Sequence, residues 1–263
     1  MSEDEMFVGL GAIACVAVVL RKQAVPLFSL SRAVAPLSIR GGVALAFALA
    51  LALTHYVVAT LSSWDVQSSS LYTGFYDLLG LAWLGLAVLA MHWLGLSLRD
   101  DVLERRNVAA LAAFGGALVG HALAYAGGNI GDGPGWWCVA VASGLASATL
   151  FGVWVVLHFA EVSDHVTVDR DLPSGIRAGA LLVACGYVFG RGAAGDWISM
   201  EDTVASFFLA AWPAFILVGV AAGIERLLTP ARPIPARLAI SGALAAGYLA
   251  AGALIVEWEG PLW

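Results

Sequence analysis

Four of the five histidines in this sequence lie in strongly apolar stretches, and one spacing relates them in pairs. His121 follows His55 at the same interval at which His158 follows His92. A neutral imidazole is a common axial ligand of haem iron, and two imidazoles from separate helices supply both axial positions. The residue type and the spacing therefore predict two bis-histidine sites, each holding one haem b.

The depth of these histidines follows from their distance along the chain from a basic residue. His55 follows Arg40 at the same interval at which His121 follows Arg106. A helix rises 1.5 Å per residue, so this interval of about 15 residues would place both histidines about 22 Å from their arginines, at one depth. The second pair, His92 and His158, falls near the other end of its helices. Its level differs from that of the first pair by about 12 Å along the helix direction. Two haems at these levels predict a transmembrane electron carrier, an oxidoreductase subunit.

Gly116, Gly120 and Arg191 complete the predicted haem sites. The two glycines are near His121 in sequence and would leave room for the porphyrin face, and close helix packing also explains them. Arg191 could serve a haem propionate or lie at the surface. We expect a quinone or a separate redox partner to exchange electrons with the haems.

Two other functions stay open at this point. Asp77 and Glu225 are ionisable residues within apolar stretches, where such residues mark ion or proton pathways. With the histidines they would form a channel or a transporter. A neutral histidine can also hydrogen-bond a neighbouring helix, which would make the chain a structural subunit of a larger complex. The fifth histidine, His165, lies in the charged stretch EVSDHVTVDRD and is predicted to be solvated.

The composition places these residues in a lipid environment. Of the 263 residues, 60% are hydrophobic and 12% are charged, and the mean hydropathy is +0.86. The apolar runs are continuous and each is close to the ~20 residues that cross a bilayer, which favours helices over a β-barrel. We predict an all-α polytopic membrane bundle with eight transmembrane helices at 6–21, 41–61, 74–96, 107–127, 136–159, 177–194, 203–226 and 238–256.

Charge predicts the orientation of this bundle. The sequence begins MSEDEMF, which is acidic where a signal peptide would be basic, so the first apolar run is predicted to be a span. With both termini outside, twelve of the thirteen Lys and Arg residues fall at cytoplasmic helix ends, and Arg191 is the exception. No exposed basic stripe remains, so nucleic acid is not an expected partner. The expected partners are the lipid bilayer and either partner subunits or a second copy of the chain.

Four of the predicted helices begin with similar sequences, which indicates an internal duplication. SIRGGVALA, ERRNVAALA, GIRAGALLV and PARLAISGA each place Arg before a run of small residues, and more aromatic helices alternate with them. The chain is therefore predicted to contain parallel two-helix repeats, or two four-helix halves, 1–132 and 133–263. Small residues four positions apart predict close packing at Gly116/Gly120, Gly186/Gly190, Gly219/Gly223 and Ala243/Gly247.

The segments VLERRNVAALAAFGGALVGHALAYAGG and IRAGALLVACGYVFGRGAAG carry a resemblance to a known family. They resemble the YjfL-like bacterial inner-membrane proteins, a domain family of unknown function with tandem N-x-A-A-x-x-x-x-x-G-x-x-x-G units. The resemblance covers about 40–260 and implies a helical fold in the bacterial inner membrane. The histidine pairs are also similar to the ligand layout of ascorbate-reducible dihaem b-type cytochromes, whose ligands alternate on four consecutive helices.

Overall fold

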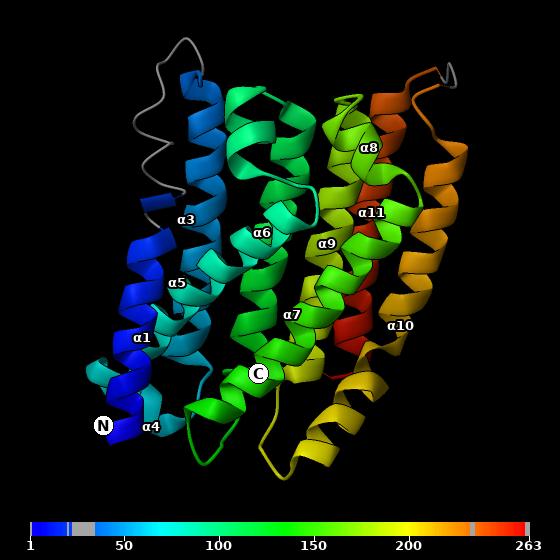
Figure 1. Cartoon of the computed structure of the whole chain (residues 1–263). Helices are drawn as coiled ribbons and strands as arrows, with labels where there is room; N and C mark the ends of the chain where they lie inside the picture. The colour runs from blue at the N-terminus through cyan, green and yellow to red at the C-terminus, as the bar shows by residue number, and fades with distance from the viewer. Residues whose placement is uncertain (1, 20, 23–34, 232–234, 261–263) are drawn as a thin grey trace.

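The computed structural model describes residues 2–19, 21–22, 35–231 and 235–260. Within these residues eight long helices stand side by side (Figure 1), with no strand beyond isolated bridges from Ser62 to residues 130 and 131. The long helices are α1 (Glu3–Val19), α3 (Leu37–Thr60), α5 (Ser70–Trp93), α6 (Val108–Gly127), α7 (Trp136–Phe159), α9 (Leu172–Ala193), α10 (Met200–Leu227) and α11 (Arg237–Trp258). Shorter helical segments are α4 (Trp64–Gln67), the π-helix η2 (Leu98–Glu104) and α8 (Val162–Thr167).

Seven of the described helices, α3, α5, α6, α7, α9, α10 and α11, are long and apolar enough to cross a membrane. They support an integral membrane protein built as a helical bundle. The helix α1 has 17 residues, so the eighth span stays a prediction. The helix α9 begins at Leu172, five residues earlier than predicted, because Asp171 accepts a hydrogen bond from the Ser174 N–H and Pro173 occupies the first turn.

The long helices form two layers. In the first layer α3, α6, α9 and α11 run parallel, and α6 and α9 make the most extensive contact. In the second layer α5 packs on both α3 and α6, α7 on both α6 and α9, and α10 on both α9 and α11. The helix α1 packs mainly against α5 (Figure 1). As a result α6 and α9 are the most buried of the membrane-length helices, and α3 and α11 have the fewest buried residues.

The close contact of α6 with α9 depends on glycine. A Cβ atom added to Gly116 would stand 2.2 Å from the carbonyl oxygen of Gly179. On the other helix, a Cβ atom added to Gly186 would stand 2.4 Å from the backbone of Gly120. No side chain fits at these distances, because the neighbouring atoms belong to rigid helix backbone. The predicted close packing at these positions is confirmed.

The other predicted small-residue pairs do not meet a neighbouring helix. A Cβ atom at Gly219, Gly223 or Gly247 would have no heavy atom within 4 Å, and Ala243 is exposed. The prediction of close packing was therefore wrong for α10 and α11. Small residues at this spacing permit a close approach, but only the arrangement of the helices decides whether a neighbour is present.

Contacts between neighbouring parallel helices join residues that are separated by a similar number of positions in the sequence. Asp171 contacts Arg237, 66 positions later, and Cys15 contacts Ala82, 67 positions later. These separations are close to the interval between the paired histidines, on which the predicted duplication depends. The duplication and its two halves stay predictions.

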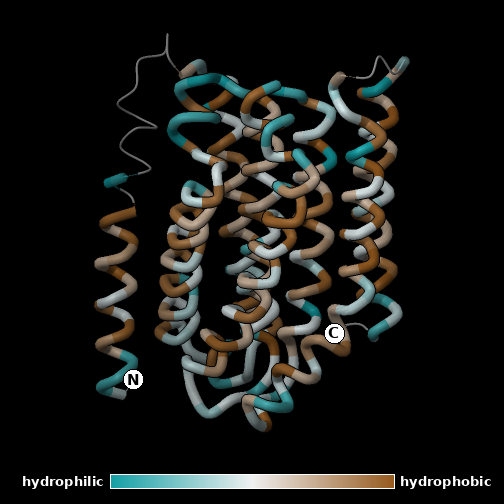
Figure 2. The backbone as a smooth tube through the Cα atoms, turned by 45° about the vertical axis from the view of Figure 1, so that its right-hand side comes forward, coloured by the Kyte–Doolittle hydropathy of each residue, from teal (hydrophilic) through white to brown (hydrophobic). Residues whose placement is uncertain are grey.

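Hydropathy separates the ends of the bundle from its middle (Figure 2). Hydrophilic colours gather at both ends, and hydrophobic colours dominate along the helices. Large apolar side chains on this middle part are exposed, among them Leu49, Leu209 and Leu254, as expected for surfaces that face lipid. The start of α1 and the end of α11 lie at the same end of the bundle (Figure 1). The side of the membrane that this end faces stays a prediction.

Candidate functional site

The structure pairs His55 with a carboxylate. His55 lies in the last two turns of α3, and its Nδ1 is 2.8 Å from Oδ2 of Asp77, early in α5. The His55 side chain is 62% exposed and the Asp77 side chain is 31% exposed, so the pair lies at the face of the bundle. An imidazole and a carboxylate at this distance can exchange a proton. We refer to these two residues as the His55–Asp77 site.

Among the described residues, Asp77 Oδ1 is buried without a hydrogen-bond partner, and so is Oγ1 of Thr54, the residue before His55. Thr54 reaches α5 because the facing residue is Gly80, where an added Cβ atom would stand 2.8 Å from the Thr54 methyl group and 2.8 Å from the Tyr125 ring. The Tyr125 hydroxyl donates to the Tyr76 carbonyl oxygen at 2.7 Å. A buried oxygen without a partner costs free energy. These atoms therefore favour a site that accepts a water molecule, a proton or a small cation.

His121, the predicted partner of His55, lies on α6 and is buried inside the bundle. It is 1% exposed, and the centroid of its ring lies 4.2 Å from that of Phe151 on α7. Its Nδ1 is buried without a hydrogen-bond partner. Among the described residues, no hydrogen bond, ion pair or ring contact joins His121 to His55.

The two histidines of the second predicted pair, His92 and His158, likewise make no direct contact. His92 on α5 and His158 on α7 are both exposed. The Nδ1 atom of His158 is 2.6 Å from Oγ of Ser163, in the short helix α8 that follows α7. In the described part of the chain, no polar or ring contact links the two histidines. Each of them stands in its own local environment.

The surroundings of His121 do not fit a haem. The space beside Gly116 and Gly120, which was predicted to receive the porphyrin, is filled by the backbone of α9. A Cβ atom at Gly120 would stand 2.5 Å from the carbonyl oxygen of Leu182. Helix packing, the other explanation of these glycines, accounts for them. The two haems b stay a prediction that this arrangement does not support.

Arg191, the residue predicted to serve a haem propionate or lie at the surface, holds the end of the last long helix. Its Nε donates to the Gly260 carbonyl oxygen at 2.9 Å, and a terminal nitrogen donates to that of Glu259 at 3.0 Å. Carbonyl groups at a helix C-terminus have no partner within the helix, so a nearby arginine satisfies them. The contacts of Arg191 are therefore those of a helix cap.

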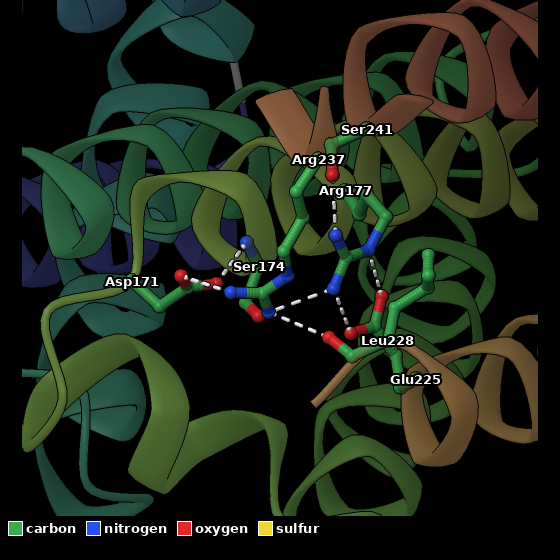
Figure 3. A network of polar contacts seen from close by, with 7 residues as sticks. All are labelled: Asp171, Ser174, Arg177, Glu225, Leu228, Arg237 and Ser241. Carbon is green, nitrogen blue, oxygen red and sulfur yellow. Dashed lines mark hydrogen bonds and ion pairs between the residues drawn. The ribbon is translucent and has the colours of Figure 1, made fainter. Parts of the chain in front are cut away.

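A second charged site is buried at the opposite end of the bundle. Arg177 of α9 is 0% exposed, and its Nε and one terminal nitrogen bond the two carboxylate oxygens of Glu225 on α10 (Figure 3). The other terminal nitrogen donates to the Ser241 hydroxyl on α11, and the Ser174 hydroxyl accepts a further bond at 3.2 Å. We refer to these four residues as the arginine cluster. Such bidentate pairing is strong and directional, so the cluster joins three helices.

A second ion pair adjoins the arginine cluster. Arg237, at the start of α11, donates to Oδ1 of Asp171 at 2.6 Å and to the Leu228 carbonyl oxygen at 2.5 Å (Figure 3). The other oxygen of Asp171 accepts from the Ser174 N–H at 2.8 Å and thereby caps α9. These contacts tie the start of α9 to the end of α10 and the start of α11.

Two of these features were not predicted from the sequence. From the sequence, Arg177 was predicted only to be one of the basic residues at cytoplasmic helix ends, and no partner was predicted for Glu225. Their position within apolar runs is the signal that could have paired them, because an unpaired charge is costly there. His165 was predicted to be solvated, which was wrong: it is 7% exposed in α8 between the buried Val162 and Val166, and α8 packs on α9.

No protein-family model, no curated protein and no solved structure matches this chain. The resemblance to the YjfL-like proteins therefore stays a prediction. Within the described residues, no three or more His, Cys, Asp or Glu side chains are grouped so that they could hold a metal ion. Among the described residues, the His55–Asp77 site and the arginine cluster are two charged sites that lie within the long apolar helices.

Proposed function

We propose that this chain is an integral membrane protein that transfers protons across the bilayer and that the His55–Asp77 site takes them up and releases them. The observation that carries the proposal is the 2.8 Å contact between an imidazole and a carboxylate within two apolar helices. Ionisable residues inside membrane helices are costly, and they commonly belong to proton relays. Histidine suits this role because its ordinary pKa lies near physiological pH.

The surroundings of this pair support a transient occupant. Asp77 Oδ1 and Thr54 Oγ1 are buried acceptors without a partner, so each can receive a hydrogen bond from an entering water molecule. Asp77 lies seven residues after Ser70, the first residue of α5. This places the carboxylate about 10 Å from the helix end, close enough for exchange with water at that end.

The arginine cluster favours a structural role. Both oxygens of Glu225 accept hydrogen bonds from Arg177, which is fully buried. Protonation of Glu225 would leave that guanidinium without its counter-charge, and a buried unpaired charge is strongly unfavourable. Of the two acidic residues predicted for a proton or ion pathway, Asp77 therefore fits proton exchange and Glu225 does not.

The proposed location is a bacterial inner membrane, with both ends of the chain on the outer side. The concentration of Lys and Arg at the opposite helix ends supports this orientation. The outer end then carries the acidic start of α1. Hydrogen bonds from Ser2 and Trp136 stabilise the Asp4 carboxylate and hold its pKa below the usual value.

The proposal is tested with the purified full-length chain in liposomes that contain a pH-sensitive dye. Under an imposed potassium diffusion potential, the wild-type protein should acidify the liposomes faster than empty liposomes acidify. Asp77→Asn removes the proton-accepting carboxylate and should lower the protein-dependent rate at least ten-fold. His55→Gln should lower it also, because the imidazole is the other half of the site.

His92→Gln is the matched control, since His92 is an exposed histidine on the same helix as Asp77. It should transport at the wild-type rate. A wild-type rate equal to that of empty liposomes, or an Asp77→Asn rate equal to the wild-type rate, would overturn the proposal. The Soret absorption of the same purified protein tests the predicted haems.

A further inference from the structure

The helices α3 and α11 form the two edges of the first layer (Figure 1), and each has one packed face and one exposed face. The packed face of α11 meets α9, because the Ser241 hydroxyl accepts a hydrogen bond from Arg177. The buried residues of α11 all lie on this face: Ser241, Ala245, Tyr248, Gly252 and Val256. The buried residues of α3 lie on the face toward α5 and α6: Ile39, Val43, Ala46, Ala50, Thr54 and Val58. The outer faces of both edge helices are therefore left unpacked.

The helices α9 and α11 receive the preceding helix of the layer at matching positions. Four glycines of α9 face α6, where an added Cβ atom would stand 2.5 Å or less from helix backbone: Gly175, Gly179, Gly186 and Gly190. Residues of the packed face of α11 follow these glycines after 66 positions, the separation of Asp171 from Arg237: Ser241, Ala245, Gly252 and Val256. The two contacts between parallel helices are thus built in the same way.

The exposed face of α11 matches the face with which α9 holds α11. On α9 this face includes Arg177 and Ala184, which contact Ser241 and Gly252. The same 66 positions lead from Arg177 to Ala243 and from Ala184 to Ala250. The exposed residues at helical spacing on this face are all alanine, and we call them the alanine face: Ala239, Ala243, Ala246, Ala250 and Ala253. A face that holds the next helix on α9 is therefore present on α11 without an occupant.

The exposed face of α3 matches the face with which α6 receives α3. Leu111 of α6 fits against Gly42, where an added Cβ atom would stand 2.6 Å from the leucine side chain, and Gly115 faces Ala46. Leu45 and Leu49 precede Leu111 and Gly115 by the same 66 positions. With two further exposed residues they form what we call the leucine face: Leu45, Leu49, Ala52 and Tyr56. The first layer thus ends in two faces of complementary kind.

We infer that copies of this chain assemble head to tail in the membrane, with the alanine face of one copy packed on the leucine face of the next. In lipid, helices associate through close packing, and small residues on one helix admit the larger side chains of the other. Because α3 and α11 are parallel within one chain, a parallel contact between them keeps all copies in one orientation across the bilayer. The assembly does not depend on proton transfer by the His55–Asp77 site.

The two faces lie at opposite edges of one chain, so their contact is heterologous. Such contacts build a ring if the rotation between copies closes and an open row if it does not. A symmetric dimer through α11 alone would instead place two alanine faces against each other. The size of cross-linked products therefore distinguishes the two arrangements.

The inference is tested by disulfide cross-linking of the full-length chain in native membranes, with the three native cysteines replaced. Ala246→Cys and Leu49→Cys are combined in one chain. The interval from Arg237 to Ala246 equals that from Arg40 to Leu49, so the two positions lie at one level. Oxidation with copper phenanthroline should give dimers and a ladder of larger oligomers. Neither single variant should give more dimer than the cysteine-free chain.

Ile216→Cys with Leu49→Cys is the matched control, because Ile216 is exposed on α10, outside the alanine face. This pair should give no ladder. In the Ala246→Cys and Leu49→Cys chain, Ala243→Trp fills the alanine face and should lower the cross-linked fraction at least ten-fold.

Val220→Trp, at an exposed position of α10, should leave the cross-linked fraction unchanged. The inference is overturned by the absence of a ladder from the double variant, by dimers from Ala246→Cys alone, or by an equal ladder with Ala243→Trp.

Discussion

Arg177 has no exposed surface, and the two oxygens of Glu225 neutralise its charge within the bundle. Glu225→Gln keeps the size of the side chain and removes the negative charge. The guanidinium would then be buried without compensation, so we expect the free energy of unfolding to fall by about 3–5 kcal/mol. Chemical or thermal unfolding of the purified chain in detergent micelles measures this loss.

The double variant Arg177→Met with Glu225→Leu separates charge from packing. An apolar pair of similar volume often replaces a buried ion pair at little cost in stability. We therefore expect the double variant to be more stable than Glu225→Gln alone. If the double variant unfolds as readily as the single one, the loss comes from packing and the charge argument fails.

At the scale of the helices, the contact between α6 and α9 is set by backbone atoms. In Gly116→Ala the new methyl group would stand 2.2 Å from the Gly179 carbonyl oxygen, so the helices must move apart. We expect a loss of about 1–3 kcal/mol in the free energy of unfolding, as for other overpacked sites. The same unfolding measurement checks it.

Gly219→Ala is the control for this change, because a Cβ atom at Gly219 on α10 meets nothing within 4 Å. Alanine is the better helix former by about 0.5–1 kcal/mol, so this variant should be as stable as the wild type or more stable. Equal destabilisation by the two alanines would show that the backbone contact between α6 and α9 does not govern stability.

At the scale of the whole molecule, the two ends of the bundle should lie on opposite sides of the membrane. Trp64 in α4 is 80% exposed at one end, and Val168 after α8 is 70% exposed at the other. In a background without the three native cysteines, Trp64→Cys should react with an impermeant maleimide added to intact cells. Val168→Cys should react only after permeabilisation. Labelling of both positions from one side would refute the bundle's proposed path across the bilayer.

The sequence by itself determined the environment and the elements of this protein. Continuous apolar runs require lipid, and the seven membrane-length helices lie close to the predicted ranges because run length and capping residues act locally. The glycines at positions 116 and 120 predict a close helix contact by their spacing alone. Such features depend on neighbours within a few residues, which the sequence shows directly.

Only the tertiary structure decided which residues meet. In lipid the packed face and the outward face of a helix are both apolar, so hydropathy does not tell how each helix is rotated. The equal spacing of His55 and His121 therefore predicted a relation between them but not their neighbours, which are Asp77 for His55 and Phe151 for His121. The bond from Arg177 to Glu225 depends likewise on how three helices converge.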